Sequence, residues 1–232
     1  MRPDQTQRAE ALIARIAASN LSKYNLSSDL PTLLDGHRIL VPGQVENDAS
    51  ILAGSPEITS NATLLARARM ANPNAVILWK PHPDVEAGLR DGAVSDPLLW
   101  ADAVLPHCDI ARVLPHVQEV WTLTSLTGFE ALLRGCKVTT LGAPFYAGWG
   151  LTRDLGPVPA RRGSGPRPDL AALVHATLID YPRYFDPKTG LSCPVEIVLE
   201  RLETGDIPKP GPFNRLTSKL QGVFASQAHL WR

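Results

Sequence analysis

The stretch "EVWTLTSLTGFEALLRGCKVTTLG", residues 119–142, holds a complete strand–helix–strand unit. Residues 119–123 and 137–142 are short apolar runs, which are typical of buried strands. Residues 125–135 between them are predicted to form a helix that stops at Gly135. Parallel strands cannot be joined by a short hairpin and need a longer crossover, which is usually a helix. A helix between two strands therefore indicates that the strands pair in parallel. The segment therefore predicts a parallel sheet covered by helices.

The same alternation continues along the chain. Apolar runs predict two further strands at residues 37–43 and 75–80. Helices are predicted at residues 5–19, 60–73, 83–92 and 109–117, the last interrupted by Pro115. Further on, we expect a loop at residues 151–169, a helix at 169–180, a turn segment at 181–194 and a helix at 194–204. These patterns indicate an α/β fold, a Rossmann-like parallel sheet with helices on both faces, followed by C-terminal helices.

The predicted elements divide the chain into four segments. We expect an N-terminal helix and linker at residues 1–35, a Rossmann-like domain at 36–150, a loop and helices that complete it at 151–205, and a tail at 206–232. Residues 213–232 are weakly amphipathic, which fits packing on the domain or contact with a membrane surface. Packing is favoured, because the basic content is low for a membrane-binding helix.

The composition excludes several classes of protein. The 232 residues carry a formal net charge of zero, which gives no argument for a nucleic-acid partner. The three cysteines, Cys108, Cys136 and Cys193, lack zinc-like spacing and indicate a reducing compartment. The N terminus has no signal-peptide core, and no apolar run approaches the about 20 residues of a membrane span. No DxD-like pair lies at a strand end and the histidines do not cluster, so we expect no metal and no cofactor.

Polar or aromatic residues follow each of the four predicted strands. The candidates after the first three are Gln44, Glu46 and Asp48, then Lys80, His82 and Asp84, then Thr124, Ser125 and Thr127. The fourth strand runs into the aromatic stretch "GAPFYAGWG", residues 142–150. In open parallel sheets, ligands bind just outside the carboxyl ends of the strands. The sequence therefore predicts a binding site at this edge.

The stretch "TSLTGFEALL", residues 124–133, is a candidate anion-binding turn. The first N–H groups of a helix and its dipole favour an anion such as a phosphate. Gly128 would let a ligand approach the backbone closely, and Glu130 would accept ribose hydroxyls. The alternative is that Ser125 and Thr127 serve only to cap the helix.

Two further motifs suggest chemistry. In "KPHPD", residues 80–84, two prolines stiffen the loop, so that Lys80 and His82 are candidates for binding a phosphate ester. Glu46 and Asp48 lie two residues apart and would share one face of an extended segment, which suits paired acid–base work. The alternative for this pair is a solvated loop.

Five motifs together resemble the bacterial capsular polysaccharide export family of β-Kdo glycosyltransferases, where Kdo is 3-deoxy-D-manno-oct-2-ulosonic acid. They are "GQVENDAS", "KPHPD", "TSLTGFEALLRG", "PFYAGWGLT" and "YPRYFDPKTG", and the likeness covers residues 5–205 in order. The resemblance implies a retaining enzyme that takes Kdo from CMP-β-Kdo and builds a poly-Kdo linker on lyso-phosphatidylglycerol. It also implies the GT-B arrangement of two Rossmann-like halves, of which residues 36–150 resemble the nucleotide-sugar-binding half.

The resemblance implies transfer through a covalent glycosyl–enzyme. Asp84 is the candidate nucleophile, because Lys80 and His82 would keep its carboxylate charged. Glu46 and Asp48 are rivals for this role, or candidates for the acid/base that handles the acceptor hydroxyl.

The remaining roles also follow from the resemblance. The expected donor-binding residues are Gln44, Lys80, His82, Thr124, Ser125, Thr127, Gly128 and Glu130. The Kdo carboxylate needs a further partner, for which Lys80, Arg161 and Arg162 are candidates. Tyr146 and Trp149 are expected either to line the ligand or to belong to the core.

The expected partners are CMP-β-Kdo and a lyso-phosphatidylglycerol-linked Kdo acceptor, with the protein in the cytoplasm at the inner membrane. The chain resembles one half of a module, so a separate acceptor half or a second module is an expected partner. Two alternatives stay open. One is a non-catalytic or partner-dependent nucleotide-sugar-binding module, and the other is a GT-B-like enzyme that uses another nucleotide sugar.

Overall fold

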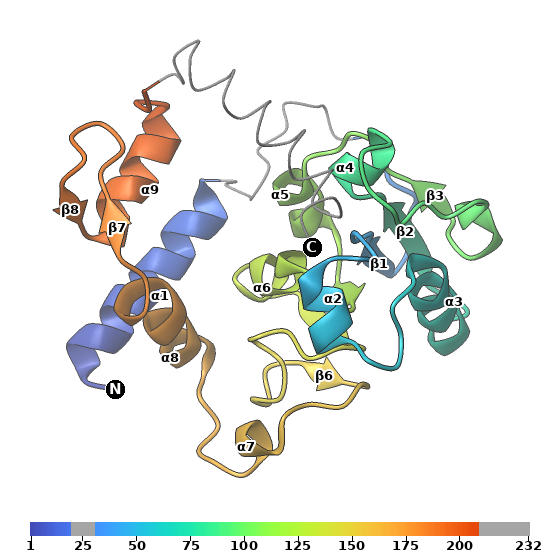
Figure 1. Cartoon of the computed structure of the whole chain (residues 1–232), viewed down its shortest axis with the longest axis horizontal. Coiled ribbons are helices and arrows are strands. Elements are labelled where there is room, and N and C mark those ends of the chain that lie inside the picture. The colour runs from blue at the N-terminus through green and yellow to red at the C-terminus, as the bar shows by residue number, and fades with distance from the viewer. Residues whose placement is uncertain (20–30, 209–232) are drawn as a thin grey trace, which may run out of the picture. The chain divides into compact units, whose positions relative to one another are not determined.

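The computed structural model describes residues 1–19 and 31–208 (Figure 1). Most of the predicted tail, including its amphipathic part at residues 213–232, and part of the predicted linker, residues 20–30, lie outside the described residues. The chain divides into two units, residues 1–182 and 183–232. No helix among the described residues combines the length and the apolar composition needed to cross a bilayer.

Six parallel strands form one sheet in the first unit. They are β1 (Arg38–Pro42), β2 (Val76–Lys80), β3 (Ala103–Val104), β4 (Glu119–Thr122), β5 (Lys137–Thr140) and β6 (Arg153–Asp154). Their order in the sheet is β3-β2-β1-β4-β5-β6, with parallel pairing between all neighbours. This is the Rossmann order, in which the direction of strand addition reverses between β1 and β4. The predicted α/β class is therefore confirmed.

The first unit also contains helices. They are α1 (Pro3–Ala18), α2 (Ala49–Gly54), α3 (Asn61–Ala71), α4 (Pro83–Glu86), α5 (Ile110–Val113), α6 (Leu126–Leu132), α7 (Ala160–Gly163) and α8 (Leu170–Val174). Of these, α2 to α6 lie between the strands in the chain, α1 precedes β1, and α7 and α8 follow β6. Short 3₁₀ turns are η1 (Pro97–Leu99) and η2 (Leu114–His116), and the π-helix η3 (His175–Asp180) continues α8. The crossover through α3 runs from β1 to β2, and the crossover through α6 runs from β4 to β5. These crossovers proceed in opposite directions along the sheet, so their right-handedness places α3 and α6 on opposite faces.

Apolar side chains are buried on both faces of the sheet. Ile39 and Ile77 are register partners and pack against Leu64 and Leu65 of α3. Successive side chains of a strand point to opposite faces, so Leu40, which is also fully buried, lies on the other side. A sheet that is covered on both faces needs strands that are apolar throughout. The central strands could therefore be predicted from apolar runs in the sequence.

Several predicted elements differ from the structure. The four predicted strands are present, but the two-residue strands β3 and β6 were missed, because so short an edge strand carries no apolar run. β6 and α7 form within residues 151–169, where a loop was expected, and α2 forms at residues 49–54, for which no element was predicted. The helix predicted at residues 83–92 ends at Glu86, and Gly88 just beyond it adopts a left-handed φ of +68°.

In its described part, residues 183–208, the second unit contains a hairpin and one helix. Strands β7 (Tyr184–Phe185) and β8 (Ser192–Cys193) pair antiparallel within the predicted turn segment, and α9 (Val195–Thr204) follows. The Asp186 carboxylate accepts hydrogen bonds from Arg201 Nε at 3.1 Å and Nη2 at 3.2 Å, and from the Lys188 N–H at 3.0 Å. These bonds tie the hairpin to α9. They favour the ionised form and lower the pKa of Asp186 to about 2.

We predict that Arg201→Gln raises the pKa of Asp186 towards its ordinary value of about 3.9. Because the pKa of Asp186 is depressed in the folded state, its contact with Arg201 stabilises this unit above a pH of about 4. This stabilisation is lost as the pH falls towards 2. Carbon NMR titration of the Asp186 carboxyl measures the change. Asp206→Asn is the matched control, since it removes another partner of Arg201 and should leave most of the depression. An unchanged Asp186 pKa in Arg201→Gln would contradict the assignment.

Candidate functional site

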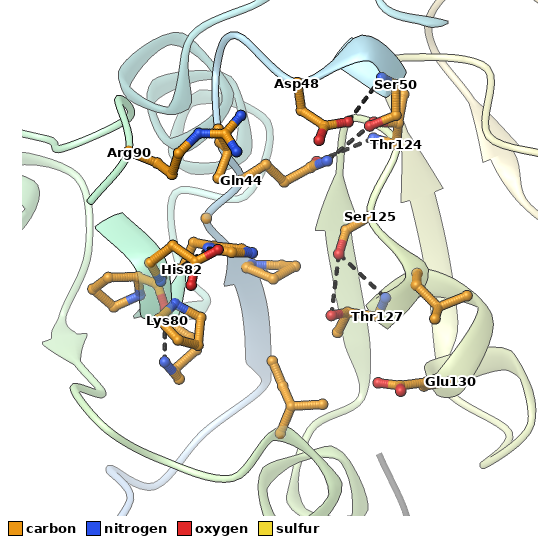
Figure 2. Close-up of a pocket in the computed structure, with 18 of the residues that line it drawn as sticks. Gln44, Asp48, Ser50, Lys80, His82, Arg90, Thr124, Ser125, Thr127 and Glu130 are labelled. Carbon is orange, nitrogen blue, oxygen red and sulfur yellow. Dashed lines mark hydrogen bonds and ion pairs between the residues drawn. The ribbon is translucent and has the colours of Figure 1, made fainter. Parts of the chain in front are cut away.

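A pocket of about 350 Å³ lies at the carboxyl ends of the strands, beside the point where the strand order reverses. Its lining comes from the segments after β1, β2 and β4, together with residues 108–110. Of the eleven residues predicted for the site, nine line it: Gln44, Asp48, Lys80, His82, Asp84, Thr124, Ser125, Thr127 and Glu130. Figure 2 shows the labelled side chains arranged around a common space. The structure thus brings together residues that are up to 86 positions apart, from 44 to 130.

Gln44 joins the ends of β1 and β4. Its side-chain Nε2 donates to Thr124 Oγ1 at 3.0 Å. Its Oε1 accepts from Thr122 Oγ1 and from the Thr124 N–H, both at 3.1 Å. The Thr122 hydroxyl in turn accepts the Ser125 N–H at 3.2 Å. Gln44 therefore acts first as a buried link that positions the turn before α6.

Glu46 does not line the pocket. Its Oε1 accepts the backbone N–H of Asn61, the first residue of α3, at 2.6 Å. The Asn61 side chain bonds the Gln44 N–H at 2.9 Å and the Gln44 and Gly92 carbonyls at 2.7 Å each. These contacts make Glu46 part of the frame that fixes the loops around the pocket.

Asp48 lines the pocket and begins α2. As the N-cap, its Oδ1 accepts the Ser50 N–H at 2.9 Å. The backbone turns here, with the Asp48 N–H donating to the Val45 carbonyl at 3.1 Å. The expected extended segment with Glu46 and Asp48 on one face is therefore wrong, because the turn sends the two carboxylates to different partners.

Lys80 is buried at the end of β2 and forms an ion pair. Its Nζ donates to Glu86 Oε2 at 3.1 Å and to the Pro81 carbonyl at 2.7 Å. The other Glu86 oxygen, Oε1, accepts the His107 N–H at 3.0 Å. The expectation that Lys80 keeps Asp84 charged therefore loses its basis, because the ammonium is already paired with Glu86.

His82 caps α4 and stands beside Asp84. The ring Nδ1 accepts the Asp84 N–H at 3.2 Å and lies 3.9 Å from Asp84 Oδ2. A neutral imidazole that accepts at Nδ1 carries its proton on Nε2, which makes Nε2 a donor. The Asp84 side chain is 48% exposed, so solvent or a ligand can reach its carboxylate.

The turn before α6 caps itself. Ser125 Oγ accepts the Thr127 N–H at 3.2 Å and donates to Thr127 Oγ1 at 3.1 Å. The capping role weighed for these hydroxyls is thus present, and both residues also line the pocket. Glu130, one turn further on, is 9% exposed, and Figure 2 shows its carboxylate directed from α6 into the pocket.

Gly128 faces an aromatic ring rather than the pocket. A Cβ built on Gly128 would lie 2.2 Å from the Tyr146 hydroxyl, and Gly128 does not line the pocket. Tyr146 is fully buried and its hydroxyl donates to the Ser125 carbonyl. Burial raises the pKa of this phenol, and the nearby Glu130 charge adds to the effect. The expected role of Gly128 in close ligand approach is replaced by one in packing.

The two arginines considered for the sugar carboxylate lie outside the pocket. Arg161 and Arg162 belong to α7, which contributes nothing to the lining. Arg162 Nη1 donates to the carbonyls of Pro144 at 2.6 Å and Ala147 at 3.0 Å, and its guanidinium lies 5.7 Å from the centre of the Trp149 ring. Arg162 therefore braces the aromatic turn after β5.

Three chemically active residues of the lining were missed in the sequence: Arg90, Cys108 and Asp109. Arg90 was placed inside a predicted helix, and no predicted strand precedes the other two, so chain order alone did not bring them to the edge of the sheet. Burial raises the pKa of the Cys108 thiol, which disfavours a reactive thiolate. Within the described residues, no group of three or more His, Cys, Asp or Glu side chains is arranged to hold a metal.

Residues 2–184 match the family described as capsule polysaccharide biosynthesis protein. The chain belongs to this family. The capsule polysaccharide modification protein LipA of Neisseria meningitidis serogroup A is similar to this chain. The two are 51% identical over 187 residues, which cover 79% of this chain. The resemblance inferred from the five motifs is thereby confirmed at the level of the family.

Two solved structures of Thermosulfurimonas dismutans KpsC share the fold. One, a beta Kdo 2,7 transferase, is 36% identical and superposes with a TM-score of 0.75 over 89% of this chain. The other, a beta Kdo 2,4 transferase, is 30% identical, with a TM-score of 0.77 over 88%. This chain spans 26% of the length of LipA, and 63% and 64% of the lengths of the two KpsC chains.

We predict that Gly128→Ala lowers the free energy of unfolding by about 1–3 kcal/mol, because the added methyl group overpacks against the buried Tyr146 ring. Urea denaturation measures the change. Gly163→Ala is the control, since nothing lies within 4 Å of a Cβ there, and its effect should stay within about 0.5 kcal/mol. Unchanged stability of Gly128→Ala together with weaker nucleotide binding would instead support the ligand-approach role.

Proposed function

We propose that this chain is the donor-binding half of a retaining β-Kdo glycosyltransferase, which uses CMP-β-Kdo to extend the lipid-linked poly-Kdo linker of capsular polysaccharide. The observation that carries the proposal is the pocket at the switch point of the sheet, in a chain that shares its fold with two Kdo transferases at 36% and 30% identity. The lipid-linked acceptor would place the reaction at the cytoplasmic surface of the inner membrane.

The turn before α6 and the α4 cap are the proposed nucleotide side of the pocket. Ser125 and Thr127 offer hydroxyls for the CMP phosphate, and the His82 Nε2–H is a donor for the same group. Glu130, with its carboxylate in the pocket, is the proposed partner of the ribose hydroxyls. Lys80 contributes to the wall while its charge is balanced by Glu86.

The proposed reaction has two displacements at C2 of Kdo. First, a carboxylate oxygen bonds to C2 while the bond from C2 to the phosphate oxygen breaks, and CMP leaves with the electron pair. Then the acceptor hydroxyl bonds to C2, its proton passes to a base, and the carboxylate is released. Two inversions give net retention.

Asp48 is the proposed nucleophile, with Asp84 as the proposed base. Asp48 follows β1 at the switch point, lines the pocket, and lies at a helix N terminus that stabilises its negative charge. Asp84 was the first choice on sequence grounds, but Lys80, on which that choice depended, is paired with Glu86. Glu46, bonded to the Asn61 N–H outside the pocket lining, is assigned to positioning.

A partner-dependent binding module is the second candidate function. It is favoured by the coverage of the relatives, since the chain spans 63% and 64% of the two KpsC chains. In a GT-B arrangement the reaction occurs between two halves, and positioning of the acceptor contributes several kcal/mol. On this proposal a matching acceptor half, supplied in trans or by fusion, restores transfer that the chain alone performs slowly.

We predict that the chain binds CMP more tightly than UMP or ADP, as measured by calorimetry. His82→Asn should weaken CMP binding by about tenfold or more, since a charge-assisted hydrogen bond is worth about 1.5–3 kcal/mol. Asn is a good N-cap residue, so the melting temperature should change little. A preference for ADP or UMP would exclude the CMP-sugar assignment. A large loss of stability in His82→Asn with unchanged affinity for CMP would leave His82 only its role as the N-cap of α4.

We predict that denaturing mass spectrometry, after incubation with CMP-Kdo and without acceptor, shows a Kdo adduct on the peptide that contains Asp48. Asp48→Asn should abolish the adduct while CMP still binds, because the carboxylate acts on the sugar carbon. Asp84→Asn is the matched variant, and it should leave the adduct in place while slowing transfer to acceptor in the presence of the acceptor half. An adduct on the Asp84 peptide would reverse the two assignments.

A further inference from the structure

The pocket contains a guanidinium that none of the roles above uses. Arg90 lines the pocket and is exposed there. Its Nη2 donates to Asn47 Oδ1 at 3.1 Å. Among the described residues this neutral amide is its hydrogen-bond partner, and no described carboxylate forms an ion pair with it. Lys80, the buried cation of the same pocket, is by contrast paired with Glu86.

The loop that carries Arg90 is firmly attached to the wall of the pocket. Asn47 Nδ2 donates to Asp91 Oδ2 at 2.8 Å, and the Glu46 N–H donates to the Asp91 carbonyl at 3.1 Å. Gly92 has a φ of +133°, and a Cβ there would lie 2.6 Å from the Gln44 carbonyl, so the backbones are in close contact. The backbone just after Arg90 is thus fixed to the segment after β1, and Asn47, which bonds Asp91, also accepts the bond from the guanidinium.

That place is next to the proposed nucleophile. Arg90 bonds to Asn47, and Asn47 directly precedes Asp48 in the chain. Figure 2 shows the Arg90 guanidinium and the Asp48 carboxylate at the same end of the pocket, away from Thr127 and Glu130. Arg90 therefore lies at the end of the pocket that holds Asp48, which is the sugar end in the proposed function.

The chemistry of an ulosonic acid requires a cation at this end. In a 2-ulosonic acid the anomeric carbon, C2, carries the carboxylate directly. A carboxylate nucleophile that attacks C2 must approach this second negative charge within a few ångströms, and like charges repel strongly in a partly desolvated site. A guanidinium beside the nucleophile offsets the repulsion and offers two parallel N–H donors to the sugar carboxylate.

We propose that Arg90 binds the carboxylate on the anomeric carbon of the donor sugar, and so selects ulosonic acid donors over aldose donors. The inference rests on the proposed function and adds a specificity residue to the same pocket. It replaces Arg161 and Arg162, whose helix contributes nothing to the lining, and Lys80, whose ammonium is bonded to Glu86 and Pro81.

The test compares ligands that differ only at the sugar. The full chain is titrated with CMP, with a non-hydrolysable CMP-Kdo analogue, and with the same analogue reduced from carboxylate to alcohol. In the unaltered chain the carboxylate analogue should bind more tightly than the alcohol. Arg90→Ala should weaken binding of the carboxylate analogue by about tenfold or more and change CMP and alcohol binding by less than about twofold.

Two further variants sharpen the comparison. Arg90→Lys keeps the charge and loses the fork of donors, so it should recover part of the affinity for the carboxylate analogue. Arg67→Ala removes an exposed arginine of α3 outside the pocket lining and should change none of the three affinities. Thermal unfolding of each variant checks that the fold is retained.

The outcomes separate this inference from the proposed function. Equal weakening of CMP and the carboxylate analogue in Arg90→Ala would assign Arg90 to the phosphate and overturn the inference. Unchanged affinity for all three ligands would overturn it as well. In both cases the unaltered chain still binds CMP and the proposed function stands. Failure of the unaltered chain to bind CMP would remove the proposed function, and this inference with it.

Discussion

The buried amide of Gln44 is the constraint on which the candidate site depends. It links the carboxyl ends of β1 and β4, between which the crossovers leave in opposite directions and open a crevice. The Thr122 hydroxyl is fully buried, and it donates to Gln44 while accepting the Ser125 N–H. Buried polar groups need partners within the protein, so these bonds must be made together. They fix where the chain leaves the sheet and turns into α6.

Helix capping and pocket lining are combined in the same side chains. Asp48, His82 and Ser125 are the N-caps of α2, α4 and α6, and all three line the pocket. Each cap uses one acceptor atom on a backbone N–H and holds the remaining polar atoms of the side chain in a fixed direction. Capping therefore fixes these side chains in place before any ligand binds, so that a structural role and a proposed binding role are compatible in the same residue.

The ion pair of Lys80 and Glu86 shapes the opposite wall. Both side chains are nearly inaccessible, at 4% and 9% exposure, and removal of one partner from such a pair costs about 3–5 kcal/mol. Glu86 also accepts the N–H of His107, which has the left-handed φ of 53°. The pair thereby holds the loop that brings Cys108 to the pocket. Because the pair is internally neutral, the proposed contacts to the anionic groups of the donor fall to His82 and Arg90.

The sequence by itself determined the central strands and the edge of the sheet at which the site forms. Parallel strands buried on both faces are continuous apolar runs, and chain order places the polar groups that follow them at one edge. Only the tertiary structure decided which groups meet. Lys80 pairs with Glu86 rather than Asp84, Gly128 faces Tyr146, and Arg90 reaches Asn47 across 43 residues. Hydrogen bonds and packing select their partners by proximity in space, which local residue patterns do not encode.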